Sequence, residues 1–211
     1  MSGITQMLVV FVPAAGGGGP TFTTVGTSDF TGTAGSFPPG FTNLDNVQGL
    51  VLSDGTRFYS PYGAYSGARF VGTFTNDQFA SCVLGSTSGS FVASPAANAD
   101  AIGVICRAST DVDTARDFYF AYVDDNQRVT YGKAVNGVVT NFALNSTVTT
   151  WAVGDVLRLY CLGTTIAVQK NGTTILSTTD SDLTTGNPGV LARAGANTLM
   201  RGDDGIFGNV T

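Results

Sequence analysis

The chain has 211 residues, ten Lys or Arg, fifteen acidic residues and no His, for a formal net charge of −5 at pH 7. All fifteen acids are Asp, because the sequence contains no Glu. These counts exclude a His base, a His metal ligand and every Ser-His-Asp or Cys-His arrangement. They also exclude a glycosidase site built on paired Glu, although Asp can substitute in principle. With no basic run, the chain is unsuited to bind nucleic acid.

Residues 1–20 differ in composition from the rest. They contain the apolar residues Leu8, Val9, Val10, Phe11 and Val12, followed by four consecutive Gly at 16–19. The apolar run is too short to span a membrane, and it lacks the basic residues that begin a signal peptide. Because a strand without sheet partners pairs readily with another chain, we predict that 1–20 is an assembly arm with a flexible joint.

Residues 21–211 are predicted to form one all-β domain. Low charge and abundant Gly, Thr, Ser and Val disfavour surface helices, so less than about a tenth of the residues should be helical. Alternating runs separated by turn signals predict strands near 21–26, 47–53, 56–59, 67–74, 78–85, 100–108, 116–124, 127–134, 138–144, 155–162, 164–170, 173–178, 188–194 and 204–210. Short strands at this spacing predict an antiparallel β-sandwich or barrel.

Period-2 alternation also assigns faces to the strands. It places six residues in the core: Phe118, Phe120, Leu157, Leu159, Ile166 and Val168. By the same rule Arg107 and Tyr119 point away from the core, toward solvent. Cys82, Cys106 and Cys161 lie in apolar runs, which is typical of reduced, buried thiols.

Several runs resemble a known group of domains. They are GVICRAS at 103–109, DFYFAY at 117–122, WAVGDVLRL at 151–159, GTTIAVQKNG at 163–172, NPGVL at 187–191 and DDGIF at 203–207. Over about residues 25–211 the chain resembles concanavalin A-like lectin/glucanase (laminin-G-like) jelly rolls, in the form found in bacteriophage structural proteins. The resemblance implies a jelly-roll sandwich. The glucanases of that group use two Glu flanking an Asp, and this sequence cannot supply them.

Candidate site residues are of two kinds. Aromatic rings and planar donors suit a sugar, and the candidates are Arg57, Tyr59, Tyr62, Tyr65, Arg107 and Tyr119. In the resembled fold the terminal strands lie side by side, which would bring Asp29 near Asp203 and Asp204 as oxygen ligands for calcium. No other cofactor is expected.

The sequence leaves three functions open. The first is a non-enzymatic virion structural protein, either a capsid decoration or a tail-associated module, located on the phage particle. Its partners would be further copies in a homo-oligomer, other virion proteins or surface glycans, without a membrane. The alternative is a carbohydrate-binding module, and the third is a glycan-cleaving enzyme that uses Asp alone.

Overall fold

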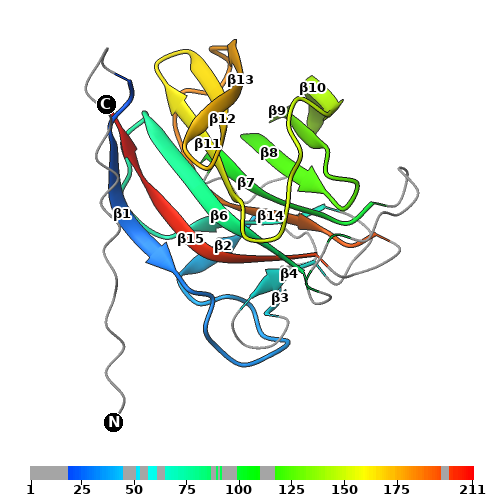
Figure 1. The fold of residues 1–211 in the computed structure, drawn as a ribbon. Coiled ribbons are helices and arrows are strands. Elements are labelled where there is room, and N and C mark those ends of the chain that lie inside the picture. Colours follow the sequence, from blue (N-terminus) through cyan, green and yellow to red (C-terminus); the bar gives the residue numbers. More distant parts are fainter. Residues whose placement is uncertain are drawn as a thin grey trace.

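Figure 1 shows a computed structural model of the chain, which describes residues 19–44, 51–52, 57–60, 65–86, 89, 91, 99–109, 117–195 and 200–211. Within these ranges the chain forms two packed antiparallel sheets and no helix, so the predicted all-β sandwich is confirmed. None of the described residues belongs to a helix long and apolar enough to cross a membrane. The predicted arm at 1–20 falls almost wholly outside the described residues.

One sheet has eight strands, and seven of them follow in the order β13-β12-β11-β6-β15-β4-β3, with β1 pairing to β15. The strands are β1 (Phe22–Ser28), β3 (Val51–Leu52), β4 (Phe58–Tyr59), β6 (Gln78–Ser86), β11 (Val156–Leu162), β12 (Thr165–Lys170), β13 (Thr173–Thr179) and β15 (Met200–Val210). The first and last strands, β1 and β15, therefore lie side by side (Figure 1).

The other sheet has seven strands in the order β10-β9-β8-β7-β14-β5-β2. They are β2 (Phe41–Asn43), β5 (Tyr65–Phe70), β7 (Ala101–Ala108), β8 (Phe118–Asp124), β9 (Val129–Val135), β10 (Val138–Ser146) and β14 (Asn187–Arg193). Among the strands that the structure describes, the sequence patterns missed only β2, which is too short to show alternation and follows two prolines and a glycine.

Two hairpins turn as their sequences predict. Asn136 and Gly137 have φ values of 51° and 75°, and Asn171 and Gly172 have 49° and 84°. Asn and Gly tolerate this left-handed backbone, which a two-residue hairpin loop requires. These turns set the register of β9 with β10 and of β12 with β13.

The main core lies between the two sheets. Leu157, Leu159, Ile166 and Val168 are fully buried there, as the alternation predicts. The three cysteines are buried and carry no disulfide, in agreement with the predicted reduced thiols. Trp151 is 1% exposed and belongs to the same core.

Strand β8 faces the opposite way from the prediction. Tyr119 pairs with Cys106, and Ala121 pairs with Val104, so these residues share the inner face of the sheet. Phe118 and Phe120 are buried instead on its outer face. Alternation separates two faces but does not say which is inside when both carry large apolar side chains.

The phenol of Tyr119 is compatible with this buried position because its hydroxyl is satisfied. It donates a hydrogen bond to Asp180 Oδ1 at 2.6 Å and accepts one from the Leu183 amide at 3.1 Å. A buried hydroxyl without partners would be costly. The prediction that Tyr119 is exposed to solvent is therefore wrong.

Candidate functional site

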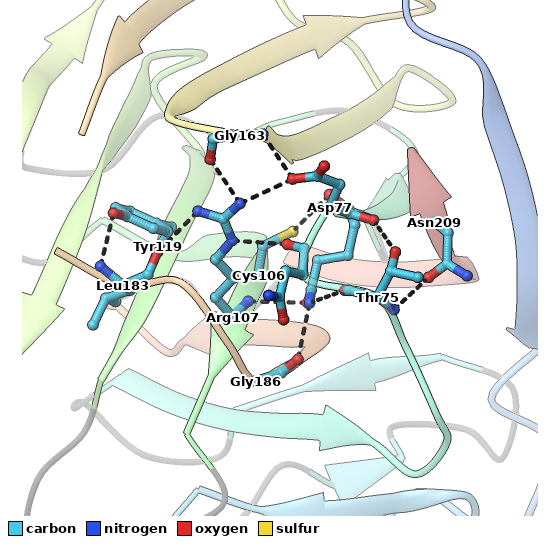
Figure 2. Close-up of polar contacts among 11 residues, drawn as sticks. Thr75, Asp77, Cys106, Arg107, Tyr119, Gly163, Leu183, Gly186 and Asn209 are labelled. Atoms are coloured by element: carbon cyan, nitrogen blue, oxygen red, sulfur yellow. Dashed lines mark hydrogen bonds and ion pairs between the residues drawn. The ribbon is translucent and has the colours of Figure 1, made fainter. Parts of the chain in front are cut away.

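Arg107 is a buried structural residue, not a ligand on a solvated surface, and it is only 2% exposed. Figure 2 shows its guanidinium directed at Gly163 and Asp77. Its guanidinium donates to four acceptors: Asn76 O at 2.9 Å, Leu183 O at 2.8 Å, Gly163 O at 2.8 Å and Asp77 Oδ1 at 3.3 Å. We call Arg107 and these four acceptors the Arg107 cluster. It joins β7 to three connections at one end of the sandwich. The predicted solvent-facing role of Arg107 is wrong.

A β-bulge explains why the Arg107 side chain is buried although the alternation predicts that it faces solvent. Ala108 pairs with Asn187 and Ile105 pairs with Gly189, so two residues of β7 lie opposite Pro188 alone. Proline has no N–H to contribute to the ladder, and Arg107 takes a left-handed φ of 51°. Its amide donates instead to Gln78 Oε1 at 3.0 Å. The alternation that predicted an outward Arg107 ends at this bulge.

The other predicted sugar-binding residues do not form one site. Arg57 precedes β4, and Tyr59 lies on β4 in the eight-stranded sheet, where its ring centroid is 4.2 Å from Arg201 Cζ. Tyr62 lies outside the described residues. Tyr65 alone among them lies on the outer face of the seven-stranded sheet.

The carboxylates of two predicted calcium ligands, Asp29 and Asp203, accept hydrogen bonds from residues close to them in the sequence. Ser28 pairs with Gly205, so Asp29 and Asp204 are indeed neighbours across the terminal strands. However, Asp29 Oδ1 accepts hydrogen bonds from the Thr31 hydroxyl and amide, which lower the pKa of its carboxyl. Asp203 Oδ1 accepts the Asp204 amide at 2.8 Å. Across the described ranges, no group of three or more His, Cys or Asp side chains is placed to hold a metal ion.

The outer face of the seven-stranded sheet carries a groove of about 380 Å³, which we call the aromatic groove. Its lining residues come from five strands and one turn: Tyr65, Phe118, Phe120, Tyr122, Ala134, Gly137, Val139, Asn141 and Leu191. Phe118, Phe120, Ala134 and Leu191 are the buried members. The half-buried tyrosines and the exposed residues of β10 surround them. The arrangement is an apolar surface with a few polar groups beside it, which is typical of small-ligand sites.

Cross-strand register assembles the aromatic part of the groove. Gly103 on β7 pairs with Tyr122 on β8 and with Leu191 on β14. A Cβ at Gly103 would lie 2.6 Å from the Tyr122 Cβ, so only glycine leaves room there. The rings of Tyr65 and Tyr122 meet at a centroid distance of 5.2 Å, although their strands are separated by β14 and β7.

Phe120, like Tyr122, lies opposite a glycine on the neighbouring strand. It pairs with Gly132 on β9, where a Cβ would lie 3.0 Å from the Phe120 ring and 2.2 Å from a backbone oxygen of β10. The Phe120 and Tyr122 rings stack with an interplanar angle of 11° and a centroid distance of 5.9 Å. Glycines beside the aromatic residues therefore keep two parallel rings in the groove.

The polar groups at the groove are tyrosine hydroxyls, one amide and one cation. Burial, followed by the neighbouring Tyr122, raises the pKa of Tyr65 well above its ordinary value, so the phenol is a neutral donor and acceptor near pH 7. Asn141 is exposed on β10. Arg193 Cζ lies 5.4 Å from the Tyr65 ring centroid. These groups can donate to and accept from hydroxyls while the rings contact C–H surfaces.

Sequence reasoning missed most of this groove. The alternation places Phe118 and Phe120 in the core, and it does not single out Tyr122, Leu191 or Asn141. The available signal was that both faces of 118–123 are apolar, which indicates a strand with ligand or core contacts on each side. The meeting of Tyr65 with Tyr122 depends on strand order, which the local sequence does not contain.

Comparisons with known proteins identify the fold. No protein-family model matches the sequence, and no curated protein matches it significantly. Carbohydrate-binding module CBM66 from Bacillus subtilis is 17% identical, with a TM-score of 0.52, covering 82% of this chain and 94% of that one. The Emp47p carbohydrate recognition domain is 14% identical, with a TM-score of 0.54 and coverage of 89% and 96%.

A third similar structure comes from work on endo-acting O-glycanases of the human gut microbiota, which initiate mucin breakdown. It is 8% identical with a TM-score of 0.55, covering 90% of this chain and all of that one. At such low identities the likeness concerns the backbone alone. The described sandwich therefore has the concanavalin A-like, galectin-like jelly-roll fold.

Proposed function

We propose that the protein is a non-catalytic carbohydrate-binding module and that the aromatic groove is its binding surface. The observation that carries the proposal is the stacked Phe120–Tyr122 pair beside Tyr65 on an outer sheet face. A pyranose presents an apolar C–H face to such rings, while its hydroxyls exchange hydrogen bonds with nearby polar groups. The carbohydrate-binding proteins that share the fold add support of a general kind.

The composition of the groove favours binding over cleavage. Glycoside hydrolysis normally needs two carboxyl groups flanking the scissile bond, about 5–10 Å apart. The described lining of the groove contains no Asp, and the chain has no Glu. Cleavage by Asp alone would need acids from elsewhere, so we place it second.

Display on a phage particle stays a prediction, because it rests on the resemblance of the sequence and on the composition of 1–20. It is compatible with glycan binding, since an adhesive module can be carried on a particle. Electron microscopy of the source particle with a label against this chain would test it, and absence of label from purified particles would contradict it.

Glycan binding is tested by an array of neutral and acidic glycans, followed by affinity electrophoresis on the best ligand. Tyr122→Ala removes one ring of the stack, and Asn141→Ala removes an exposed amide; both should weaken retention at least tenfold, which corresponds to about 1.4 kcal/mol. Phe22→Ala is the matched control, because this half-buried ring packs on the outer face of the other sheet. Retention unchanged in both groove variants, or no binding across the array, would overturn the proposal.

A further inference from the structure

Two arginines lie on the same outer face as the aromatic groove. Arg69 pairs with Gly189, and Tyr65 pairs with Arg193, so these four residues share one face of β5 and β14. Leu191, between them on β14, belongs to the groove. From strand rise and spacing, the two arginine Cα atoms are roughly 14 Å apart. The face therefore carries two cations on the side of the groove formed by β5 and β14.

The two guanidiniums differ in their surroundings. Arg193 Cζ lies 5.4 Å from the Tyr65 ring centroid, which orients it beside the aromatic residues. Arg69 is half-buried, and no hydrogen bond, ion pair or ring contact engages its side chain among the residues that the structure describes. A half-buried cation without a partner has lost part of its hydration without compensation, so an anion bound there would gain more than at an exposed lysine.

Two described acids at the ends of β8 have partners of their own. Asp124 Oδ2 accepts two hydrogen bonds from the Arg128 guanidinium, at 2.5 and 2.8 Å. Asp117 Oδ1 accepts the Asn136 amide at 2.6 Å. The Asp124 carboxylate is therefore paired with Arg128, and the Asp117 carboxylate is oriented toward the turn between β9 and β10.

We propose that the module selects acidic saccharides, with a sugar ring stacked in the aromatic groove and anionic groups paired with Arg69 and Arg193. This inference rests on the proposed carbohydrate-binding function and names its ligand class. A guanidinium presents a planar fork of donors that fits a carboxylate or a sulfate. Two arginines whose Cα atoms are about 14 Å apart suit a polymer that carries repeated charges along its length.

The test compares charged and neutral versions of one backbone. Affinity electrophoresis and calorimetry use polygalacturonate against fully methyl-esterified polygalacturonate, and dextran sulfate against dextran. The wild-type protein should bind at least one charged polymer ten or more times more tightly than its neutral counterpart, with affinity falling as salt rises. The first pair reports carboxylates and the second reports sulfates.

Substitutions test whether the two arginines cause the preference for charged polymers over neutral ones. Arg69→Gln with Arg193→Gln should reduce binding of the charged polymer at least tenfold and flatten the salt dependence, while binding of a neutral polymer is retained. Arg158→Gln is the matched control for each single substitution, because it removes one charge from the outer face of the other sheet, beside Phe22 and Phe79. Melting temperatures of all variants show that they are folded.

The outcomes separate the two proposals. Neutral glycans bound through Tyr122 without preference for charge would overturn the acidic specificity and leave the carbohydrate-binding proposal standing. Binding of charged polymers that Arg158→Gln weakens as much as the double variant would also overturn it, because attraction would then be non-specific. Failure to bind any charged or neutral saccharide would overturn both.

Discussion

Replacing Arg107 should cost more stability than replacing the half-buried Arg69. Three of its four acceptors are backbone carbonyls, and the fourth is the Asp77 carboxylate, whose side chain is 38% exposed. Hydrogen bonds from a charged donor contribute about 1.5–3 kcal/mol each, but they are not additive and the Asp77 pair is screened by solvent. Arg107→Ala should therefore lower the free energy of unfolding by about 3–5 kcal/mol.

The assay is urea denaturation of the full chain followed by fluorescence. Trp151 is the single tryptophan and is 1% exposed, so its emission reports opening of the core directly. Arg107→Lys should lose roughly half as much as Arg107→Ala, because an ammonium cannot reach three diverging carbonyls. The matched control is Arg69→Ala, which should change stability by less than about 1 kcal/mol.

Two results would refute this reasoning. The first is a loss below about 1 kcal/mol in Arg107→Ala, since unsatisfied buried carbonyls alone should cost more than that. The second is an equal loss in Arg107→Ala and Arg69→Ala, which would mean that total charge, not the cluster geometry, sets the effect.

Three further predictions address the core, acid stability and the arm. Leu159→Ala, at a fully buried site, should cost about 2–5 kcal/mol in urea denaturation, and an unchanged midpoint would contradict its inward register. Burial raises the pKa of Asp155, but hydrogen bonds from Lys170, Asn171 and the Ala152 amide outweigh it and hold the pKa below its ordinary 3.8. The stability that Asp155 contributes is thus present above about pH 4 and lost as pH falls through the folded-state pKa, so Asp155→Asn should flatten the acid limb of a melting-temperature profile. Deleting residues 1–19 should leave the melting temperature unchanged but reduce the oligomer mass in light scattering, and full assembly of the truncated chain would count against the arm.

The sequence predicts the strands well because each one carries its own alternation and turns. The Asn-Gly turns and the faces of β11 and β12 follow from neighbouring residues alone. For β8 the same reasoning fails, since Phe118 and Tyr119 are both large and apolar enough to be inside. The pairing of Tyr119 with Cys106 decides the question, and that pairing is not local.

The candidate site is less predictable for the same reason. Arg107 looks like a sheet-surface residue until Pro188, eighty-one positions later in the chain, removes a ladder donor and creates the bulge. The aromatic residues near Tyr65 in the sequence make it a candidate, yet its ring contact in the structure is Tyr122. A bulge or a groove depends on which strands are adjacent, and a single sequence does not reveal this.

The acceptors in the Arg107 cluster have a consequence for how the sequence can vary. Because Asn76 and Leu183 contribute main-chain oxygens, exchanging their side chains leaves those two bonds in place. Exchanging Arg107 for a residue without a cationic side chain removes all the bonds of its guanidinium at once. The donor position should therefore tolerate far fewer substitutions than the acceptor positions. In saturation mutagenesis with selection for folded protein, position 107 should accept very few residue types, while position 76 should accept most of them. Among the members of the Arg107 cluster, folding would then be most sensitive to substitution at a single side chain.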